Sequence, residues 1–209
     1  MTAPRTSRPR GQARRERLLD AATELFATNG SRGTGIAAVA AEAGVTGATL
    51  LHHFGSKDGL LLAVLEERDK RLGGDWRHVV QPGGLEMFRR LPEIADTWIR
   101  EPAVNRLHLV LMAESIDDES PGHRYFAWRQ SALRRSLRRA IEAGQATGEV
   151  RADIDARTKA IEIAAFLDGI ALQWQLDPER IPLREVVEAY AQTLVDALAA
   201  RPETDRNKR

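Results

Sequence analysis

The sequence contains no cysteine among its 209 residues. Without thiols the chain has no disulfides, no cysteine-ligated zinc and no thiol catalysis, which fits a reducing cytoplasm. No apolar run approaches the roughly 20 residues of a membrane-spanning helix, so we expect no membrane partner. The basic N-terminus is not followed by an apolar stretch, so it does not have the pattern of a secretory signal. These absences predict a cytoplasmic protein.

The sequence also has no large excess of positive or negative charge, because its formal net charge is only +1. A molecule that coats nucleic acid through general basicity is therefore excluded. Basic residues are concentrated locally instead: residues 1–17 hold six arginines and one acid, Glu16. Residues 1–11 also contain two prolines and a glycine without apolar periodicity, so we expect a disordered basic arm. Whether this arm contacts DNA is left open by the sequence.

Aromatic residues make up only 5% of the chain, while Ala, Leu, Arg and Glu are abundant, and this balance favours helices. Apolar residues recur at helical spacing and predict an all-α fold of about nine helices. The expected ranges are 12–28, 36–43, 46–53, 56–72, 84–99, 103–116, 123–146, 155–176 and 183–200. Gly73 and Gly74 are expected to end the fourth helix, and Pro92 to kink or break the fifth. Residues 201–209 form a polar tail.

The stretch from Ile36 to Lys57 has the pattern of a helix-turn-helix. Ala40 allows two helices to cross closely, and Gly44 is able to adopt the left-handed conformation that ends a helix. Val39, Val45 and Leu50 supply apolar contacts between the helices, and the Thr46 hydroxyl is placed to cap the second one. The second helix of this motif enters the major groove of DNA. We therefore expect residues 12–57 to form a DNA-binding domain and residues 58–200 a second helical domain.

The two C-terminal helices are unusually apolar. Residues 155–176 are apolar nearly all round, and residues 183–200 carry a wide apolar stripe, which is typical of helices buried on most sides. We therefore predict a homodimer through these helices, in which two from each chain form a four-helix bundle.

The segments RRERLLDAATELFATNG and IAAVAAEAGVTGATLLHHFGSKDGLL, within Arg14–Leu62, resemble the DNA-binding domain of the TetR family of bacterial transcriptional repressors. The resemblance spans about fifty residues without a gap; the rest of the chain resembles the family only in helix order and size. It implies a ligand-responsive repressor that binds a pseudo-palindromic double-stranded DNA operator as a dimer and is released by a small-molecule effector. It implies neither a cofactor nor catalysis.

The resemblance implies base or backbone contacts from Thr46, Gly47, Ala48, Thr49 and Leu51, and phosphate contacts from His53 and Lys57. Leu51 stands where the family usually has tyrosine, and Gly47 stands where a long polar side chain is common. This sparse surface suggests that phosphate contacts supply much of the affinity. The full predicted DNA-binding set is Arg14, Thr34, Thr46, Gly47, Ala48, Thr49, Leu51, His52, His53 and Lys57.

Aromatic and polar residues on the later helices are the candidates for an effector pocket. Aromatic side chains at helical spacing are also ordinary core, and a polar group beside an apolar face is also a rim residue or an internal pair. Asp168 belongs to the same polar group. The predicted ligand-binding set is Trp98, Leu111, Glu114, Ser115, Phe126, Trp128, Arg129, Phe166, Gln173 and Trp174.

Other interpretations remain open beside this one. The protein could be an activator or a ligand-free repressor, or a small helical binding or enzyme module whose N-terminal hairpin is only structural. Arg134, Arg135, Arg138 and Arg139 form a basic patch, which is a solvated face or a second nucleic-acid surface. His52 and His53 do not predict a metal site, because neighbouring residues on a helix point about 100° apart. The chain has no GxSxG, glycine-rich phosphate loop or HExxH motif.

Overall fold

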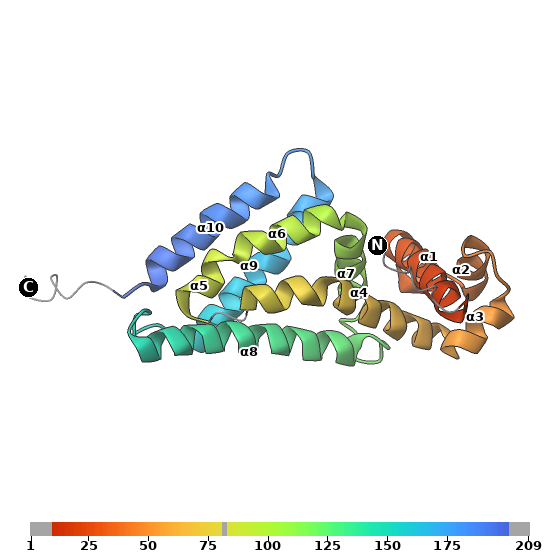
Figure 1. Ribbon diagram of the computed structural model, residues 1–209, viewed down its shortest axis with the longest axis horizontal. Helices are drawn as coiled ribbons and strands as arrows, with labels where there is room; N and C mark the ends of the chain where they lie inside the picture. The colour runs from red at the N-terminus through yellow and green to blue at the C-terminus, as the bar shows by residue number, and fades with distance from the viewer. Residues whose placement is uncertain (1–9, 81–82, 201–209) are drawn as a thin grey trace, which may run out of the picture. The chain divides into compact units, whose positions relative to one another are not determined.

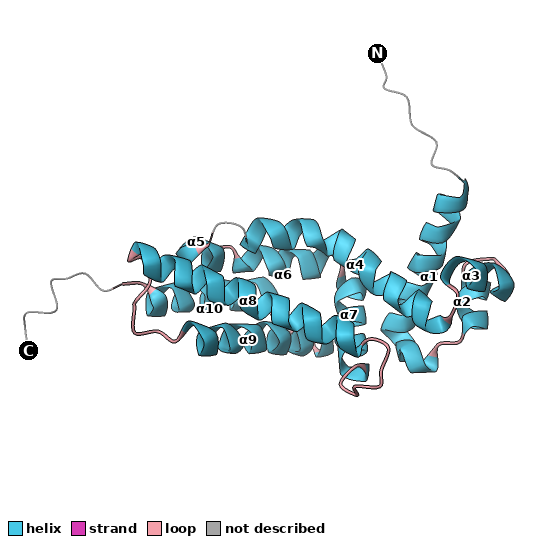
Figure 2. Ribbon diagram, turned by 90° about the horizontal axis from the view of Figure 1, so that it is seen from below, coloured by secondary structure: helices cyan, strands magenta, loops and turns pink. Residues whose placement is uncertain are grey.

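The computed structural model describes residues 10–80 and 83–200, and these residues confirm the all-α fold. Ten helices follow one another in the described chain (Figure 1): α1 Arg10–Gly33, α2 Ile36–Glu42, α3 Gly47–Phe54, α4 Lys57–Val80, α5 Gly84–Arg89, α6 Leu91–Arg100, α7 Pro102–Glu114, α8 His123–Thr147, α9 Ala156–Leu176 and α10 Leu183–Leu198. Within residues 10–80 and 83–200 the only strand-like pairing is an isolated antiparallel bridge between Val150 and Ala199. Figure 2 shows the same helical content from a second direction.

The chain divides into two compact units, and neither corresponds to a single stretch of sequence. The first consists of the described part of Met1–Lys70 together with Ala103–Arg124. The second consists of Arg71–Pro102 and the described part of Tyr125–Arg209. The unit that contains α2 and α3 therefore also holds the first part of α4 and nearly all of α7, and it is larger than the range of 12–57 expected from the sequence.

The first unit is built on an apolar stripe of α1, whose Leu18, Leu19 and Phe26 are fully buried. α2 packs against both α1 and α3. Burying such side chains contributes about 1.5–3 kcal/mol each, which holds the short α2 and α3 in place. Helices of seven and eight residues would not be stable alone.

The second unit contains α5, α6, α9 and α10, together with the end of α4 from Arg71 and α8 from Tyr125. α10 packs mainly against α6 and α5, which lie beside it in Figure 1. Its apolar stripe is therefore used inside the protomer, with Val187 and Leu198 fully buried. The Glu149 carboxylate accepts a hydrogen bond from the Leu85 backbone N–H at 3.2 Å, so it caps the start of α5.

The predicted helix breaks at Gly73–Gly74 and at Pro92 have different outcomes in the structure. α4 continues through Gly73 and Gly74 to Val80, so the predicted end of this helix is wrong. A glycine inside a helix costs only about 1 kcal/mol relative to alanine, and the buried Val79 favours continuing the last turn. The predicted break at Pro92 is confirmed, because Pro92 lies in the first turn of α6 and divides the expected range into two helices.

The two ends of the chain were predicted as a disordered basic arm and a polar tail. Residues 1–9 and 201–209 lie outside the described residues, whereas residues 10 and 11 belong to α1. None of the described helices is both long enough and apolar enough to cross a membrane.

Candidate nucleic-acid interface

The turn between α2 and α3 has the geometry that the sequence predicts. Gly44 has a φ of 67°, and the Val45 N–H donates to the Ala40 carbonyl at 2.9 Å. Ala40 is 2% exposed, so the crossing depends on its small side chain. The Thr49 N–H donates to the Thr46 hydroxyl oxygen at 3.2 Å, which confirms Thr46 as the cap of α3.

α3 turns one side inward and the other to solvent. Leu50 is fully buried, which anchors the helix against the rest of the unit. The exposed side is formed by Thr46, Ala48, Leu51 and His52, with Gly47, Thr49 and His53 half-buried beside it. The structure thus brings seven of the ten predicted DNA-binding residues together on one short helix and its cap.

The hydroxyls on this surface are already engaged with each other. The Thr46 and Thr49 oxygens lie 3.0 Å apart, and the Thr46 oxygen also accepts from the backbone. Leu51 is 42% exposed, which is a large value for an aliphatic side chain on a short helix. The exposed side of α3 therefore consists mainly of small and apolar groups and has few hydrogen-bonding groups available to a partner.

Two further predicted residues, Arg14 and Lys57, lie on α1 and α4. Lys57 is the first residue of α4 and is half-buried, and its Nζ donates to the Arg32 carbonyl at 3.4 Å. Arg14 is exposed on α1. Its neighbour Arg15 lies over the Phe54 ring, 5.4 Å from the ring centroid, so a cation–π contact joins α1 to the end of α3.

The predicted role of Thr34 is wrong. This residue is 2% exposed, and its hydroxyl lies 2.8 Å from the Gly30 carbonyl and 3.2 Å from the Leu25 carbonyl, so its donor is used internally. A buried hydroxyl must be hydrogen-bonded to avoid a large desolvation cost. Thr34 therefore holds the segment between α1 and α2 together and does not face DNA.

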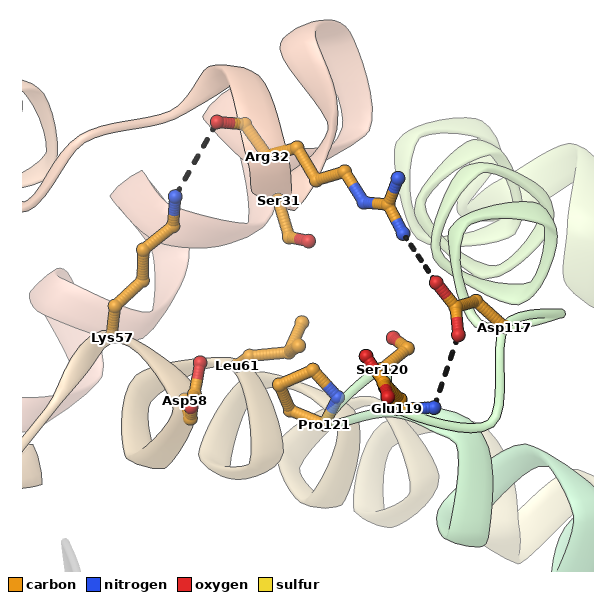
Figure 3. Close-up of a pocket in the computed structure, with 9 residues that line it drawn as sticks. All are labelled: Ser31, Arg32, Lys57, Asp58, Leu61, Asp117, Glu119, Ser120 and Pro121. Carbon is orange, nitrogen blue, oxygen red and sulfur yellow. Dashed lines mark hydrogen bonds and ion pairs between the residues drawn. The ribbon is translucent and has the colours of Figure 1, made fainter.

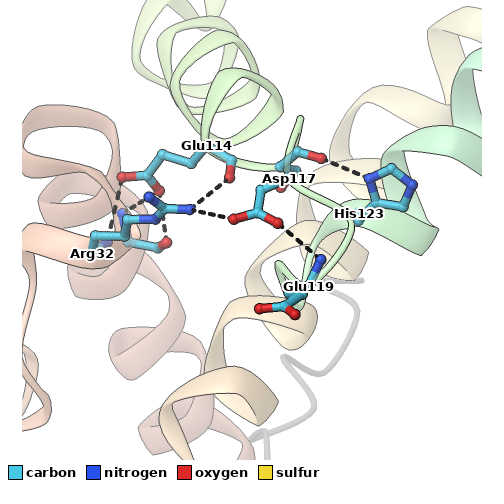
Figure 4. A network of polar contacts seen from close by, with 7 residues as sticks. Arg32, Glu114, Asp117, Glu119 and His123 are labelled. Atoms are coloured by element: carbon cyan, nitrogen blue, oxygen red, sulfur yellow. Dashed lines mark hydrogen bonds and ion pairs between the residues drawn. The ribbon is translucent and has the colours of Figure 1, made fainter.

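A carboxylate from α7 holds the end of α1 (Figure 4). Gly30 breaks the helical geometry with φ 72°, so the residues that follow begin a new helical turn with free N–H groups. The Glu114 carboxylate accepts from the Ser31 N–H at 2.8 Å, the Ser31 hydroxyl at 2.6 Å and the Arg32 N–H at 3.4 Å. An anion at a helix start is favoured by these donors and by the helix dipole.

The loop after α7 extends this network. Arg32 lies 3.7 Å from the Asp117 carboxylate, and Asp117 also accepts from the Glu119 N–H at 3.1 Å. The His123 ring lies 3.0 Å from the Ser115 carbonyl. The Arg32–Asp117 pair is mostly exposed, so it contributes little stability, whereas the part-buried Glu114 contacts contribute more.

A polar pocket of about 250 Å³ lies beside this network (Figure 3). It carries both signs of charge, because two cations, Arg32 and Lys57, and three acids, Asp58, Asp117 and Glu119, line it. Its full lining is Ser31, Arg32, Lys57, Asp58, Leu61, Asp117, Glu119, Ser120 and Pro121. Arg32 and Lys57 already have oxygen partners within the protein. We therefore interpret the pocket as part of an internal polar network and not as a binding site for a charged ligand.

The structure separates the predicted effector residues. Leu111, Glu114 and Ser115 belong to the first unit, and the other seven belong to the second. Trp98, Phe126 and Trp174 are buried, Phe166 stacks on Tyr190 with ring centroids 3.6 Å apart, and Arg129 is half-buried. Trp128 is 61% exposed and Gln173 is also exposed, so the structure places these two at the surface of their unit and not in its interior. Glu114 is the internal cap described above.

Asn105 is a candidate that the sequence did not suggest. It lies on α7, is 2% exposed, and neither its amide oxygen nor its amide nitrogen has a hydrogen-bond partner among the described residues. An unsatisfied buried amide costs about 1–3 kcal/mol, and a ligand that pairs with it would recover that cost. No sequence signal distinguishes it, because Asn105 is one polar residue in an amphipathic helix.

The sequence matches models of two known protein families or domains. The family model described as "Bacterial regulatory proteins, tetR family" matches residues 18–64. The model described as "BetI-type transcriptional repressor, C-terminal" matches residues 89–200. The chain belongs to the TetR family. A TetR-family chain is a ligand-responsive, DNA-binding transcriptional repressor, so the resemblance inferred from Arg14–Leu62 is confirmed.

Individual relatives cover nearly the whole chain. The repressor KstR2 of Rhodococcus jostii is 26% identical over 203 residues, covering 96% of this chain and 98% of that protein. The regulator TtgR of Pseudomonas putida is 27% identical over 212 residues, covering 95% and 97%. These relatives are transcriptional regulators.

Solved structures of other transcriptional regulators share the fold. A TetR regulator from Chloroflexus aurantiacus aligns with a TM-score of 0.80 at 22% identity, covering 91% of this chain and 98% of that chain. The regulator FadR of Bacillus subtilis, solved in complex with stearoyl-CoA, aligns with a TM-score of 0.74 at 16% identity, covering 88% and 99%.

Proposed function

We propose that this TetR-family protein binds a pseudo-palindromic double-stranded DNA operator as a homodimer and that a small-molecule effector releases it. The observation that carries the DNA contact is α3, an eight-residue helix with Leu50 buried, Thr46 as its cap and its other side open to solvent. A helix fixed in this way is the form that enters a major groove. The regulation requires no catalysis, and its site of action is the cytoplasm, where bacterial DNA lies.

The composition of the α3 surface suggests how DNA is read. Ala48 and Leu51 offer apolar contacts to thymine methyl groups, and His52 offers a hydrogen bond to a base edge. Phosphate contacts would come from Arg14, His53 and Lys57, and from free N–H groups at the start of α3 and α4. Because few long polar side chains are present, we expect a steep salt dependence and modest discrimination per base pair.

One face of α9 carries exposed apolar residues, and this face supports the proposed homodimer. Ala165, Gly169, Leu172 and Leu176 are exposed and recur at helical spacing, with Ile161 at the N-terminal edge. Leu176 is 73% exposed and Leu172 47% exposed, although both are large apolar residues. The small Ala165 and Gly169 would let a second helix approach closely. α10 is the second helix that we assign to this interface.

An effector contact is proposed at Asn105. The relative with stearoyl-CoA shows that one protein of this fold binds an apolar chain with a polar head. For this chain we propose an effector with an apolar body that also carries a group able to pair with the Asn105 amide. The effector would favour a dimer in which the two α3 helices no longer match the operator spacing.

The DNA proposal is tested by fluorescence anisotropy with a labelled duplex from the region upstream of the gene, at low and moderate salt. The variant Ala48→Glu adds a negative charge to the exposed side of α3 and should weaken binding at least tenfold. Ala113→Glu adds the same charge at an exposed site on α7 and is the matched control. Equal losses in both variants, or no binding by the wild type at low salt, would refute the proposal.

A further inference from the structure

The second unit holds an arginine-lined cavity that the DNA-binding function does not use. It measures about 460 Å³ and is lined by residues of α8 and α9. We call it the arginine cavity and define it by its lining: Ser131, Arg134, Arg135, Arg138, Arg157, Ala160 and Ile161. Ser131, Arg134, Arg135 and Arg138 follow one side of α8, because residues three or four apart are neighbours on a helix.

Positive charge in this cavity exceeds the negative charge around it. α8 carries six arginines and a single carboxylate, Glu142. Glu142 lies 3.3 Å from Arg138 and is itself exposed. Arg135 donates to the Ser131 hydroxyl at 3.1 Å, which is a neutral partner. Four guanidinium groups around one cavity repel each other unless an anion lies among them.

Two nearby aspartates do not remove this excess. The Asp155 carboxylate accepts from the Arg157 and Thr158 backbone N–H groups as the cap of α9, so its acceptors are largely used. Asp168 does not line the cavity, and its carboxylate accepts a hydrogen bond from Gln130 at 2.9 Å. The strongest remaining complement for the cavity is an anion from outside the chain.

We propose that the arginine cavity binds a small organic ligand that carries two or more linked phosphate groups, of the nucleoside polyphosphate type. Guanidinium groups bind phosphate through paired, charge-assisted hydrogen bonds, which explains a cluster of arginines in place of lysines. The volume exceeds that of a single phosphate and lies in the range of small-molecule pockets. Ala160 and the half-exposed Ile161 provide an apolar wall for the organic part of the ligand.

The site is separate from the DNA contact. Every residue that lines it belongs to the second unit, whereas α3 belongs to the first. Ile161 also stands at the edge of the α9 face assigned above to the dimer, so the ligand would bind at the end of that interface. Loss of operator binding would leave this proposal unaffected, because ligand binding is measured directly.

The proposal is tested by isothermal titration calorimetry of the full-length protein with ATP, inorganic triphosphate and inorganic phosphate. The double variant Arg135→Gln/Arg157→Gln should bind ATP about 100-fold more weakly than the wild type, or about tenfold for each arginine. ATP should bind more tightly than triphosphate if the apolar wall contacts the organic part, and single phosphate should bind weakly. Circular dichroism melting of each variant checks that it is folded.

The matched control is Arg139→Gln, which removes an exposed arginine of the same helix that does not line the cavity. If the control and the double variant weaken ATP binding equally, the effect comes from the overall charge of the protein, and the proposed site is wrong. The proposal is also overturned if ATP does not bind the wild type, or if a random-sequence duplex displaces ATP completely. It fails too if the double variant changes only the sedimentation coefficient, because a second copy of the chain would then be the partner of these arginines.

Discussion

Gly59 determines how closely the start of α4 approaches the end of α3. A Cβ atom built on Gly59 would lie 2.1 Å from the Phe54 carbonyl oxygen, which belongs to the backbone and cannot rotate away. At Gly47, by contrast, the nearest atom to such a Cβ is Ile36 Cγ2 at 3.8 Å, an ordinary contact. The position of α3 therefore depends on the absence of one methyl group.

The substitution Gly59→Ala should lower the free energy of unfolding by about 1–3 kcal/mol, because α3 and α4 must separate to accommodate the methyl group. Urea denaturation followed by circular dichroism measures this change. Gly47→Ala is the control and should unfold close to the wild-type midpoint. Equal stability of the two variants would show that the close approach at Gly59 is not needed.

Asn105→Leu tests the unsatisfied amide on α7. Removing a buried polar group that has no partner should raise the free energy of unfolding by about 1–3 kcal/mol. The same thermal or urea denaturation measures it, with Asn29→Leu on the exposed side of α1 as the comparison. A less stable Asn105→Leu protein would mean that water or another group satisfies the amide, and the argument for an effector contact would be lost.

Asp168 makes stability depend on pH. Burial raises the pKa of its carboxyl above the ordinary value of 3.8, and the hydrogen bond from Gln130 offsets this only partly. In the window between 3.8 and the raised pKa the folded state binds more protons than the unfolded state, so stability falls as pH rises through that window. Above the window the loss is constant.

Asp168→Asn should therefore melt at a higher temperature than the wild type at pH 7, and the difference should shrink as pH is lowered toward 3.8. Differential scanning fluorimetry across this range measures the trend. Glu188→Gln, at an exposed site on α10, should show no such trend. If Asp168→Asn is less stable at pH 7, the carboxylate is instead stabilised in its charged form by Arg129 and Arg134.

At the scale of elements, Glu114 joins α7 to the turn that follows Gly30. Its carboxylate accepts two hydrogen bonds from Ser31 and one from Arg32, and Gly30 beside it has a φ of 72°, which side chains other than glycine rarely adopt. α7 is therefore held to the segment that leads from α1 into α2. This connection makes α7 part of the unit that carries the DNA contact.

Glu114→Ala should lower the melting temperature, because charge-assisted hydrogen bonds contribute about 1.5–3 kcal/mol each when part-buried. It should also weaken DNA binding while leaving the oligomeric state unchanged. Glu119→Ala removes a carboxylate from the loop that follows α7 and is the matched control. A Glu114→Ala protein with wild-type stability and DNA affinity would show that the cap has no role in placing α2 and α3.

The sequence predicts the elements better than it predicts their contacts. Helical spacing identifies most helices, and Gly44, Thr46 and Pro92 act locally, so their roles follow from the residues themselves. Glu114 was assigned to an effector pocket because its partner Ser31 lies 83 residues away in sequence. Thr34 and Trp128 were misplaced for the same reason, because burial depends on long-range packing that local periodicity does not report.

At the scale of the whole molecule, the proposed homodimer depends on what covers the exposed face of α9. The apolar stripe of 183–200, which the sequence assigns to the dimer, is largely used against α5 and α6. The exposed apolar face of α9 consists of Ala165, Gly169, Leu172 and Leu176, with Ile161 at its N-terminal edge. We propose that a second copy of the chain covers this face and that the resulting homodimer presents two α3 helices to one duplex, whose half-sites lie about 34–36 Å apart for helix-turn-helix dimers.

The central claim is that two protomers read one operator, and sedimentation velocity of the protein with a labelled operator duplex tests it most directly. The account predicts a single complex of two chains per duplex for the wild type. Gly169→Glu, which places a charge in the α9 face, should abolish that complex and sediment as a monomer, whereas Ala127→Glu on α8 should behave as the wild type. A complex of one chain per duplex, or a full dimer complex with Gly169→Glu, would contradict the account.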